Sequence, residues 1–209
     1  MSVGIQGWVE VQPKGFEPAR GETWLGVIRV TDLVDPSSDM FACLFGIQNF
    51  ANFRPIAPAR GFPPHLSPEA QHDVDESQFQ GKPGYFGETW VSWAELAGID
   101  WDERAEAPDS RVHQYTRDEH GRLRYTGKAS YSRDLARELG LGIAEILAQP
   151  PVFAEGTEWD INGTIYRVET LTRRQTLAET RTWPVLFSLM RTLAERFGED
   201  GVRLVVWFD

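Results

Sequence analysis

The chain of 209 residues has almost no cysteine, and Cys43 is the only one. A single thiol excludes a disulfide within the chain and a metal site built from several thiolates. Because Cys43 lies among Met40, Leu44 and Phe45, we interpret it as a small buried hydrophobic residue rather than a nucleophile. With 41% apolar residues, one core can bury roughly 70% of the extended-chain surface, so folding needs neither a disulfide nor a metal.

Long hydrophobic runs are also missing. No apolar run follows a basic start at the N-terminus, and none approaches the length needed to span a bilayer. Together with the shortage of cysteine, these absences lead us to expect a soluble protein in the reducing cytoplasm that does not contact a membrane.

The short motifs that identify common catalytic and cofactor sites are absent too. The chain has no glycine-rich phosphate loop, no His-Glu-x-x-His, no cysteine pair and no Gly-x-Ser-x-Gly. The histidines are scattered at spacings that match no common metal site: His65, His72, His113 and His120. We therefore expect no metal and no other cofactor, and the motifs leave open whether the protein is an enzyme.

Charge is abundant but unevenly distributed, with a net charge of −10. Between Glu69 and Asp109 eleven acidic residues face two basic ones, Lys82 and Arg104, so this segment contributes −9 and the rest of the chain −1. Such a surface disfavours direct binding to nucleic acid phosphates. The acidic segment is either a solvated face that aids solubility or, alternatively, a docking surface for a basic protein partner or a mimic of a nucleic acid.

The stretch from Ser38 to Pro64 is the most unusual part of the sequence. A short apolar helix over 38–45 is predicted to end at Gly46, and four prolines then forbid a continuous helix or central strand over 47–64. Long irregular segments in compact domains are often functional. Four polar side chains of this loop are candidates for a ligand site or, alternatively, for bonding to the loop's own carbonyls and nearby helix ends: Asn49, Asn52, Arg54 and Arg60.

The remaining patterns predict one α+β domain over residues 1–209. We expect mainly antiparallel sheet with several hairpins and packed helices, and a C-terminal helix followed by a final central strand. The expected strands are 5–11, 23–30 and 202–208, with hairpins over 111–126 and around Asn162-Gly163. The expected helices begin at Ser67-Pro68, at a Ser92–Glu95 capping box and at Thr182, and two more cover 132–139 and 142–148. The arginines at 173, 174 and 181 are expected in a link between elements.

Two charged residues of the middle hairpin, Arg111 and His113, fall on the same face of a predicted strand. Arginine offers a planar fork and histidine titrates near neutrality, so this pair suits a phosphate or a carboxylate. The alternative is that both belong to a solvated hairpin face. Four tryptophans are either core residues or the lining of a pocket: Trp24, Trp90, Trp93 and Trp101.

Three short blocks of the sequence together carry a resemblance to other proteins. They are Met40-Phe41 with Leu44-Phe45-Gly46-Ile47-Gln48-Asn49, then Arg60-Gly61-Phe62-Pro63-Pro64 with Ser67, and then Thr89-Trp90-Val91-Ser92-Trp93-Ala94-Glu95-Leu96. This pattern resembles a group of uncharacterised bacterial and bacteriophage proteins with Phe-x-x-Leu-x-Gly-x-Arg, Arg-Gly-Leu-Pro and Ser-Trp elements. Gln48 stands where that group has arginine, and Phe62 where it has leucine. The resemblance implies an accessory protein of phage or mobile-element type and no catalytic residues.

Two functional hypotheses follow from the sequence. The first is a non-enzymatic protein-binding or accessory protein that docks a partner through the acidic segment or the loop after Gly46. The second is an enzyme or sensor that binds a small phosphorylated or anionic ligand through Arg54, Arg60, Arg111 and His113, with Asn49 and Asn52 orienting it.

Overall fold

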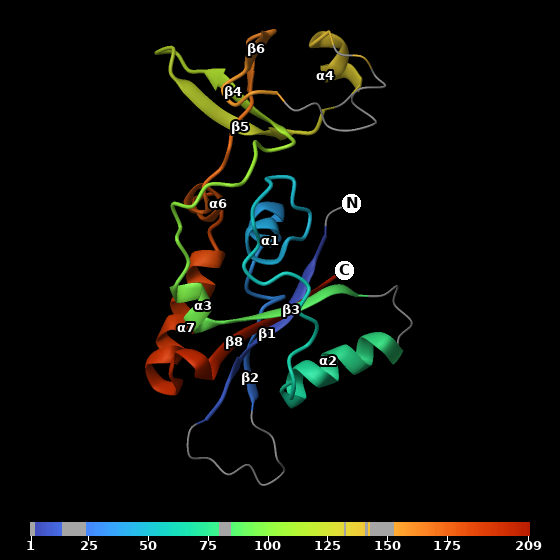
Figure 1. Ribbon diagram of the computed structural model, residues 1–209, viewed down its shortest axis with the longest axis vertical. Coiled ribbons are helices and arrows are strands. Elements are labelled where there is room, and N and C mark those ends of the chain that lie inside the picture. Colours follow the sequence, from blue (N-terminus) through green and yellow to red (C-terminus); the bar gives the residue numbers. More distant parts are fainter. Residues whose placement is uncertain (1–2, 14–23, 80–84, 132, 141, 143–152) are drawn as a thin grey trace.

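The computed structural model describes residues 3–13, 24–79, 85–131, 133–140, 142 and 153–209. Within these residues the chain forms two antiparallel sheets of four strands each and six α-helices (Figure 1). The two sheets lie at different levels along the long axis of the molecule. The α+β fold with mainly antiparallel sheet is as the sequence predicts.

The first sheet is built around its strand β8. The strand order is β2 (Leu25–Arg29), β1 (Ile5–Val11), β8 (Val202–Phe208) and β3 (Phe86–Ser92). All of β8 is buried, because Leu204, Val206 and Phe208 enter one core while Val205 and Trp207 enter another on the opposite face. The prediction of a central strand over 202–208 is confirmed.

Helices cover both faces of this sheet. The larger core contains α1 (Ser38–Phe45) and α7 (Trp183–Phe197), where the ring of Phe41 meets Phe208 edge-on with centroids 5.1 Å apart. Val74 of α2 (Pro68–Phe79) packs against the other face (Figure 1). The short helix α3 (Trp93–Ala97) follows β3 directly and packs beside α7. In the described part of the chain, no helix has the length and apolarity to cross a bilayer.

Helix-end signals in the sequence are confirmed at α1 and α3, whereas Thr182 before α7 makes no side-chain cap hydrogen bond. Ser37 caps α1 by accepting a hydrogen bond from the backbone N–H of Met40 at 3.3 Å, and Gly46 ends the helix with a left-handed φ of 75°. Ser92 and Glu95 form the predicted capping box of α3. These signals are local, so they hold whatever the tertiary packing.

The second sheet has the order β5 (Leu123–Ala129), β4 (Val112–Arg117), β7 (Thr164–Arg167) and β6 (Glu158–Ile161). Both predicted hairpins are present. The Asn162-Gly163 turn between β6 and β7 has φ values of 53° and 81°, as a type I′ turn requires. The helix predicted over 132–139 corresponds to α4 (Arg133–Glu138), and residues 143–148 of the next predicted helix lie outside the described residues.

One predicted link is instead a helix. Residues 173 and 174 belong to α6 (Arg173–Ala178), which packs against α1. Thr172 and Gln175 form a capping box at its start, so the sequence signal was the same Ser/Thr-x-x-Glu/Gln pattern that marks α3. The number of arginines in this segment concealed that signal, because they suggested a solvated link.

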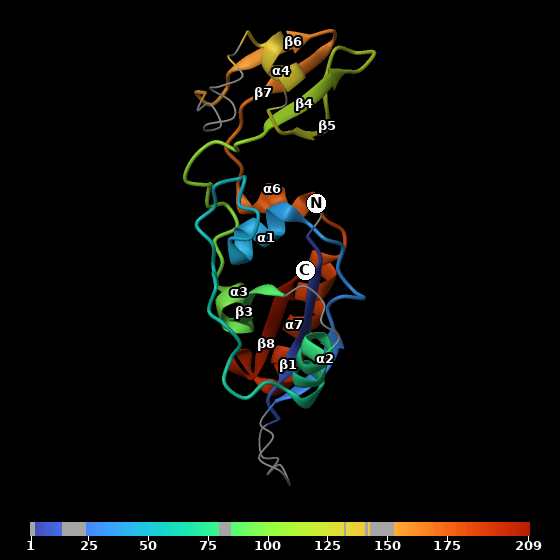
Figure 2. The same ribbon diagram turned by 90° about the vertical axis from the view of Figure 1, so that its right-hand side faces the viewer.

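The second sheet is inserted into the chain of the first. The chain leaves through residues 104–111 and returns through 168–172, and these two segments run antiparallel (Figure 2). The N–H of Ala105 donates to the carbonyl of Leu171 at 2.8 Å, and the N–H of Asp109 donates to the carbonyl of Glu169 at 2.9 Å. This two-stranded connection positions the second sheet beyond α1 and α6.

A substitution at Gly7 tests the register in which β1 pairs with β8. Its φ is 152°, and a Cβ there would lie 2.2 Å from the carbonyl oxygen of Val205 on β8. We expect Gly7→Ala to lower the free energy of unfolding by about 3 kcal/mol in urea denaturation, because the methyl group forces β1 and β8 apart. The matched control is Gly98→Ala, with φ −86° and no atom nearer than 3.5 Å to the new Cβ, which should leave stability unchanged or slightly raised. A fully stable Gly7→Ala variant would contradict the pairing of Gly7 with Val206.

Candidate functional site

Arg111, a predicted ligand-binding residue, lies just before β4 and is held by two carboxylates. Its guanidinium donates to the two oxygens of Asp109 at 2.9 and 2.6 Å, and to Oδ1 of Asp39 at 2.5 Å. Asp39 belongs to the first turn of α1, where the helix dipole favours a negative charge. Arg111 therefore joins the second sheet to a helix that covers the first.

Lys128 of β5 makes a second link to the same carboxylate. Its Nζ lies 2.6 Å from Oδ2 of Asp39 and 3.0 Å from Oε2 of Glu179, and its side chain is only 7% exposed. Asp39 thus binds one cation with each oxygen. Glu179, directly after α6, adds a contact from another element of the first-sheet unit.

His113, the second predicted residue of this strand, is 2% exposed and has a carboxylate on each side. Its Nε2 lies 3.3 Å from Oδ2 of Asp109, and its Nδ1 lies 3.2 Å from Oε2 of Glu169. Burial by itself lowers the pKa of the imidazole, but the hydrogen bonds to the two carboxylates outweigh burial and raise the pKa above its ordinary value. The raised pKa favours the imidazolium form, in which both ring nitrogens donate to the flanking carboxylates.

The two carboxylates beside His113 respond in the opposite direction. Burial raises the pKa of Asp109, yet the hydrogen bonds from His113 and Arg111 hold it below the ordinary value. Burial likewise raises the pKa of Glu169, and hydrogen bonds from His113 and Tyr115 lower it further than burial raises it. The hydroxyl of Tyr115 donates to Oε1 of Glu169 at 2.7 Å. The carboxylates of Asp109 and Glu169 and the side chains of Arg111 and His113 therefore stabilise one another.

We call this group the ionic cluster: Asp39, Asp109, Arg111, His113, Lys128 and Glu169. The interpretation of Arg111 and His113 as a solvated hairpin face is wrong, because α1 and the two-stranded connection cover them. The alternation of the strand correctly places both residues on one face, but the covering helix comes from a segment about seventy residues earlier, as the sequence separation of 72 between Arg111 and Asp39 shows. Chemically, the cluster is a closed set of ion pairs rather than an open anion site.

The side chains of Asn49 and Asn52 stabilise the irregular loop by hydrogen bonds to backbone groups. The side-chain oxygen of Asn49 accepts from the N–H of Phe53 at 3.0 Å, and its amide donates to the carbonyl of the same residue at 2.7 Å. Asn52 adopts a left-handed φ of 58° and donates to the carbonyl of Pro108 at 2.6 Å. Both side chains thus bond to backbone, as the alternative interpretation of the loop requires.

Arg54 and Arg60 each form an ion pair with a different glutamate. Arg54 binds Glu103 at 2.8 Å, whereas Arg60 binds both oxygens of Glu95 at 2.7 and 3.1 Å and stacks over Trp90. Within the described residues, no hydrogen bond or ion pair joins either arginine to the ionic cluster. The structure therefore brings Arg111 and His113 together and leaves the four loop residues in separate contacts.

Arg173 is a buried residue that the sequence did not single out. Its guanidinium is 1% exposed and donates to the carbonyl oxygens of Cys43 and Arg54 at 3.0 and 2.7 Å, and it forms an ion pair with Glu103 at 3.1 Å. Cys43 itself is fully buried, as predicted, and burial raises the pKa of its thiol despite the nearby Arg173. This environment opposes formation of a reactive thiolate.

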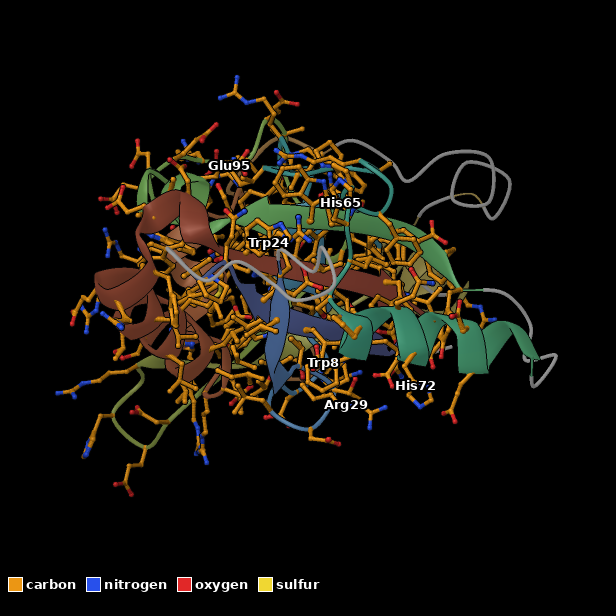
Figure 3. All side chains as sticks on the ribbon, turned by 90° about the horizontal axis from the view of Figure 1, so that it is seen from below. Trp8, Trp24, Arg29, His65, His72 and Glu95 are labelled. Atoms are coloured by element: carbon orange, nitrogen blue, oxygen red, sulfur yellow. The ribbon has the colours of Figure 1, made fainter. Side chains whose placement is uncertain are left out.

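A second buried arginine, Arg203, lies in the central strand β8. It binds Glu10 of β1 at 2.6 Å and donates to the carbonyl of His65 at 2.8 Å, while Trp24 covers its guanidinium at 3.8 Å (Figure 3). A signal for this pair exists in the sequence, since one charge in each of two apolar strands requires a buried partner.

The carboxylates of the acidic segment do not share one surface. Asp109 belongs to the ionic cluster, and Glu95, Asp102 and Glu103 bind arginines elsewhere in the chain. Four of the other members lie on α2 and Asp100 lies in the turn after α3, at opposite ends of β3 (Figure 1). Glu88 lies on β3 itself, and Glu106 lies in the two-stranded connection. The segment therefore does not form one continuous acidic surface.

One side of α2 is hydrogen-bonded to the first sheet, and the other side is exposed to solvent. Glu69 accepts from the N–H of Gly26, and Asp73 accepts from Nε1 of Trp8, each at 2.9 Å, so α2 is fixed to the sheet (Figure 3). Asp75 and Glu76 are exposed on the outer side. The helix contains no lysine or arginine. Its last acidic residue, Glu76, lies in the final turn, where the negative end of the helix dipole disfavours a carboxylate.

A groove of about 410 Å³ lies between α3, α6 and α7. Two of the four candidate pocket tryptophans, Trp93 and Trp101, line it, whereas Trp24 and Trp90 stack on arginines elsewhere. The full lining is Trp93, Leu96, Ala97, Trp101, Leu177, Pro184, Phe187, Ser188 and Arg191.

Comparisons with protein families, with curated proteins and with solved structures find no match to this chain. Among the described residues, no group of three or more histidine, cysteine, aspartate and glutamate side chains has the arrangement of a metal site.

His113 predicts how stability depends on pH. Because its pKa is raised from 6.5 in the folded protein, its contribution is fully present below pH 6.5 and is lost as the pH rises through the folded pKa. The pKa of Asp109 is lowered from 3.8, so its contribution is present above that pH and is lost as the pH falls through the folded pKa. We expect the unfolding free energy, measured with urea, to be highest between these limits.

His113→Gln should be less stable than the wild type at pH 6 and should lack the decline above pH 6.5. The matched control is His120→Gln, whose side chain is 67% exposed, and it should keep the wild-type pH profile. An unchanged alkaline slope in His113→Gln would show that the imidazole is neutral in the folded protein.

Proposed function

We propose that this protein is a non-enzymatic binding protein of accessory type that docks a basic protein partner on α2. The observation that carries this proposal is the charge of α2, which has four carboxylates and no lysine or arginine. Glu69 and Asp73 hold the helix to the sheet, whereas Asp75 and Glu76 face solvent.

The local electrostatics of α2 favour a role in docking. Acidic groups late in a helix destabilise it, and within the described residues Glu76 has only the i−4 side chain of His72, at 3.6 Å, to offset its charge. A basic partner would supply cations that pair with these carboxylates and would offset the repulsion between Glu76 and the negative end of the helix dipole. Charge complementarity of this kind mainly raises the association rate, and its effect weakens with salt.

The ionic cluster supports a non-enzymatic role. Both nitrogens of His113 lie within 3.3 Å of carboxylate oxygens, and Arg111 and Lys128 already have anionic partners. Because the described thiol, Cys43, is buried with a raised pKa, it lacks the properties of a nucleophile.

Charge reversal on α2 tests the proposal. Asp75→Lys/Glu76→Lys should abolish capture of a basic partner from native cells, while stability in urea stays equal or rises by a few tenths of a kcal/mol because the helix dipole is better matched. The matched control is Asp100→Lys/Glu106→Lys, which changes the same number of exposed carboxylates of the acidic segment away from α2. Equal capture by both variants would contradict docking on α2, and recovery of no basic partner by the wild type would contradict the proposal itself.

The alternative, a small anionic ligand at Arg54, Arg60, Arg111 and His113, requires the anion to displace a carboxylate from each cation. We therefore expect a thermal-shift screen with nucleotides and sugar phosphates to leave the melting temperature unchanged. A ligand at one hundred times its Kd would stabilise the protein by roughly 2.7 kcal/mol, which is readily measured. A shift that disappears in Arg54→Ala/Arg60→Ala would favour this alternative.

A further inference from the structure

The groove between α3, α6 and α7 has the size and composition of a small-molecule site. Its volume of about 410 Å³ falls within the range of roughly 300–1,000 Å³ that such sites occupy. Side chains from both α3 and α7 line it, together with Leu177 of α6. The residues from α7 are Pro184, Phe187, Ser188 and Arg191, whose spacing of three and four places them on one side of the helix.

Aromatic rings form much of this lining. The rings of Trp101 and Phe187 lie 5.7 Å apart at an angle of 45°, and Phe187 also contacts Trp183 beneath it at 5.9 Å. Trp93, Trp101 and Phe187 are each half-buried, so the protein itself covers only part of their surface. A flat apolar ligand would cover the remainder in offset or edge-to-face contact.

Only one residue of the lining is charged, and its sign is opposite to the net charge of the chain. Arg191 is exposed, and within the described residues no hydrogen bond or ion pair engages its guanidinium. Other arginines near this region, such as Arg60 and Arg174, are bound by carboxylates. The hydroxyl of Ser188, three residues before Arg191, lies on the same side of α7 and adds a donor.

The neighbouring carboxylates do not cancel this positive charge. Asp102, next to Trp101, directs both oxygens to Arg174 at 2.7 and 3.0 Å. Asp100 uses one oxygen to accept from the N–H of Asp102 at 2.9 Å. The groove therefore combines an aromatic wall with one available guanidinium.

We propose that this groove binds an organic monoanion with a flat apolar body and one carboxylate. The ring system lies against Trp101 and Phe187, and the carboxylate accepts from Arg191 and Ser188. Arginine suits this role because its planar fork can bind both oxygens of a carboxylate. This site is separate from α2 and does not depend on the function proposed there.

The test uses 2-naphthoate as the probe and its neutral amide, 2-naphthamide, as the matched ligand. Isothermal titration should show saturable binding of the acid, roughly tenfold or more tighter than the amide, because a hydrogen bond to a charged group contributes more than a neutral one. In two-dimensional NMR, the indole N–H signals of Trp93 and Trp101 should shift on titration.

Three variants locate the contacts. Arg191→Gln should weaken naphthoate binding by roughly tenfold to a hundredfold and remove the preference over the amide. Arg196→Gln changes another exposed arginine of α7 that does not line the groove, so binding should stay at the wild-type level. Ser188→Phe should fill the groove and block both probes, and its exposed position on α7 leaves folding intact.

Several outcomes would overturn the proposal. These are the absence of naphthoate binding at millimolar concentration, equal affinity for acid and amide, unchanged binding by Arg191→Gln, or full binding by Ser188→Phe. Wild-type melting temperatures for the variants establish that any loss of binding is not a loss of fold.

Discussion

Every buried charge in a folded chain needs a partner. The partners of the buried Arg173 come from several segments of the chain, so its hydrogen bonds hold these segments together. Its guanidinium donates to the carbonyls of Cys43 and Arg54 as well as to Glu103. These groups belong to α1, to the irregular loop and to the turn before the two-stranded connection. Removal of the guanidinium would leave two carbonyls without this donor, at a cost of about 1–3 kcal/mol for each buried group left unsatisfied.

The ionic cluster extends this arrangement to the second sheet. Asp39 is placed by α1, and α1 is in turn fixed at its other end by Arg173. Arg111 and Lys128 reach Asp39 from different positions in the second sheet. Loss of one partner of a buried ion pair typically costs 3–5 kcal/mol, so the position of this sheet relative to α1 depends on a few charges.

Sequence alone predicts those features whose causes are local. The left-handed end of α1 at Gly46 and the Asn162-Gly163 turn follow from backbone geometry over a few residues. The apolar spacing of α7 and the strand after it likewise suffices to predict a helix packed on a central strand. The α+β class follows from these parts.

The candidate site is less predictable because its contacts join distant segments. Alternation along β4 indicates that Arg111 and His113 share a face, but nothing local indicates that Asp39 and Glu169 cover it. Linear charge density was also a poor guide to surface charge. Asp109 lies within the acidic segment yet is buried between Arg111 and His113. Glu95 and Glu103 of the same segment bind Arg60 and Arg54, which are 35 and 49 residues away in the sequence. A strongly acidic run can therefore supply partners for arginines that are remote in the sequence.

The antiparallel pairing of residues 104–109 with 169–172 also has an evolutionary consequence. Because the chain enters and leaves the second sheet at neighbouring points, the intervening segment can lengthen or shorten while the strands and helices of the first sheet keep their places, as long as cations still reach Asp39. Insertions are tolerated where the ends of the inserted segment are already close together. The second sheet is thus the part of the molecule in which a lineage can change most of its surface through a single event in the gene.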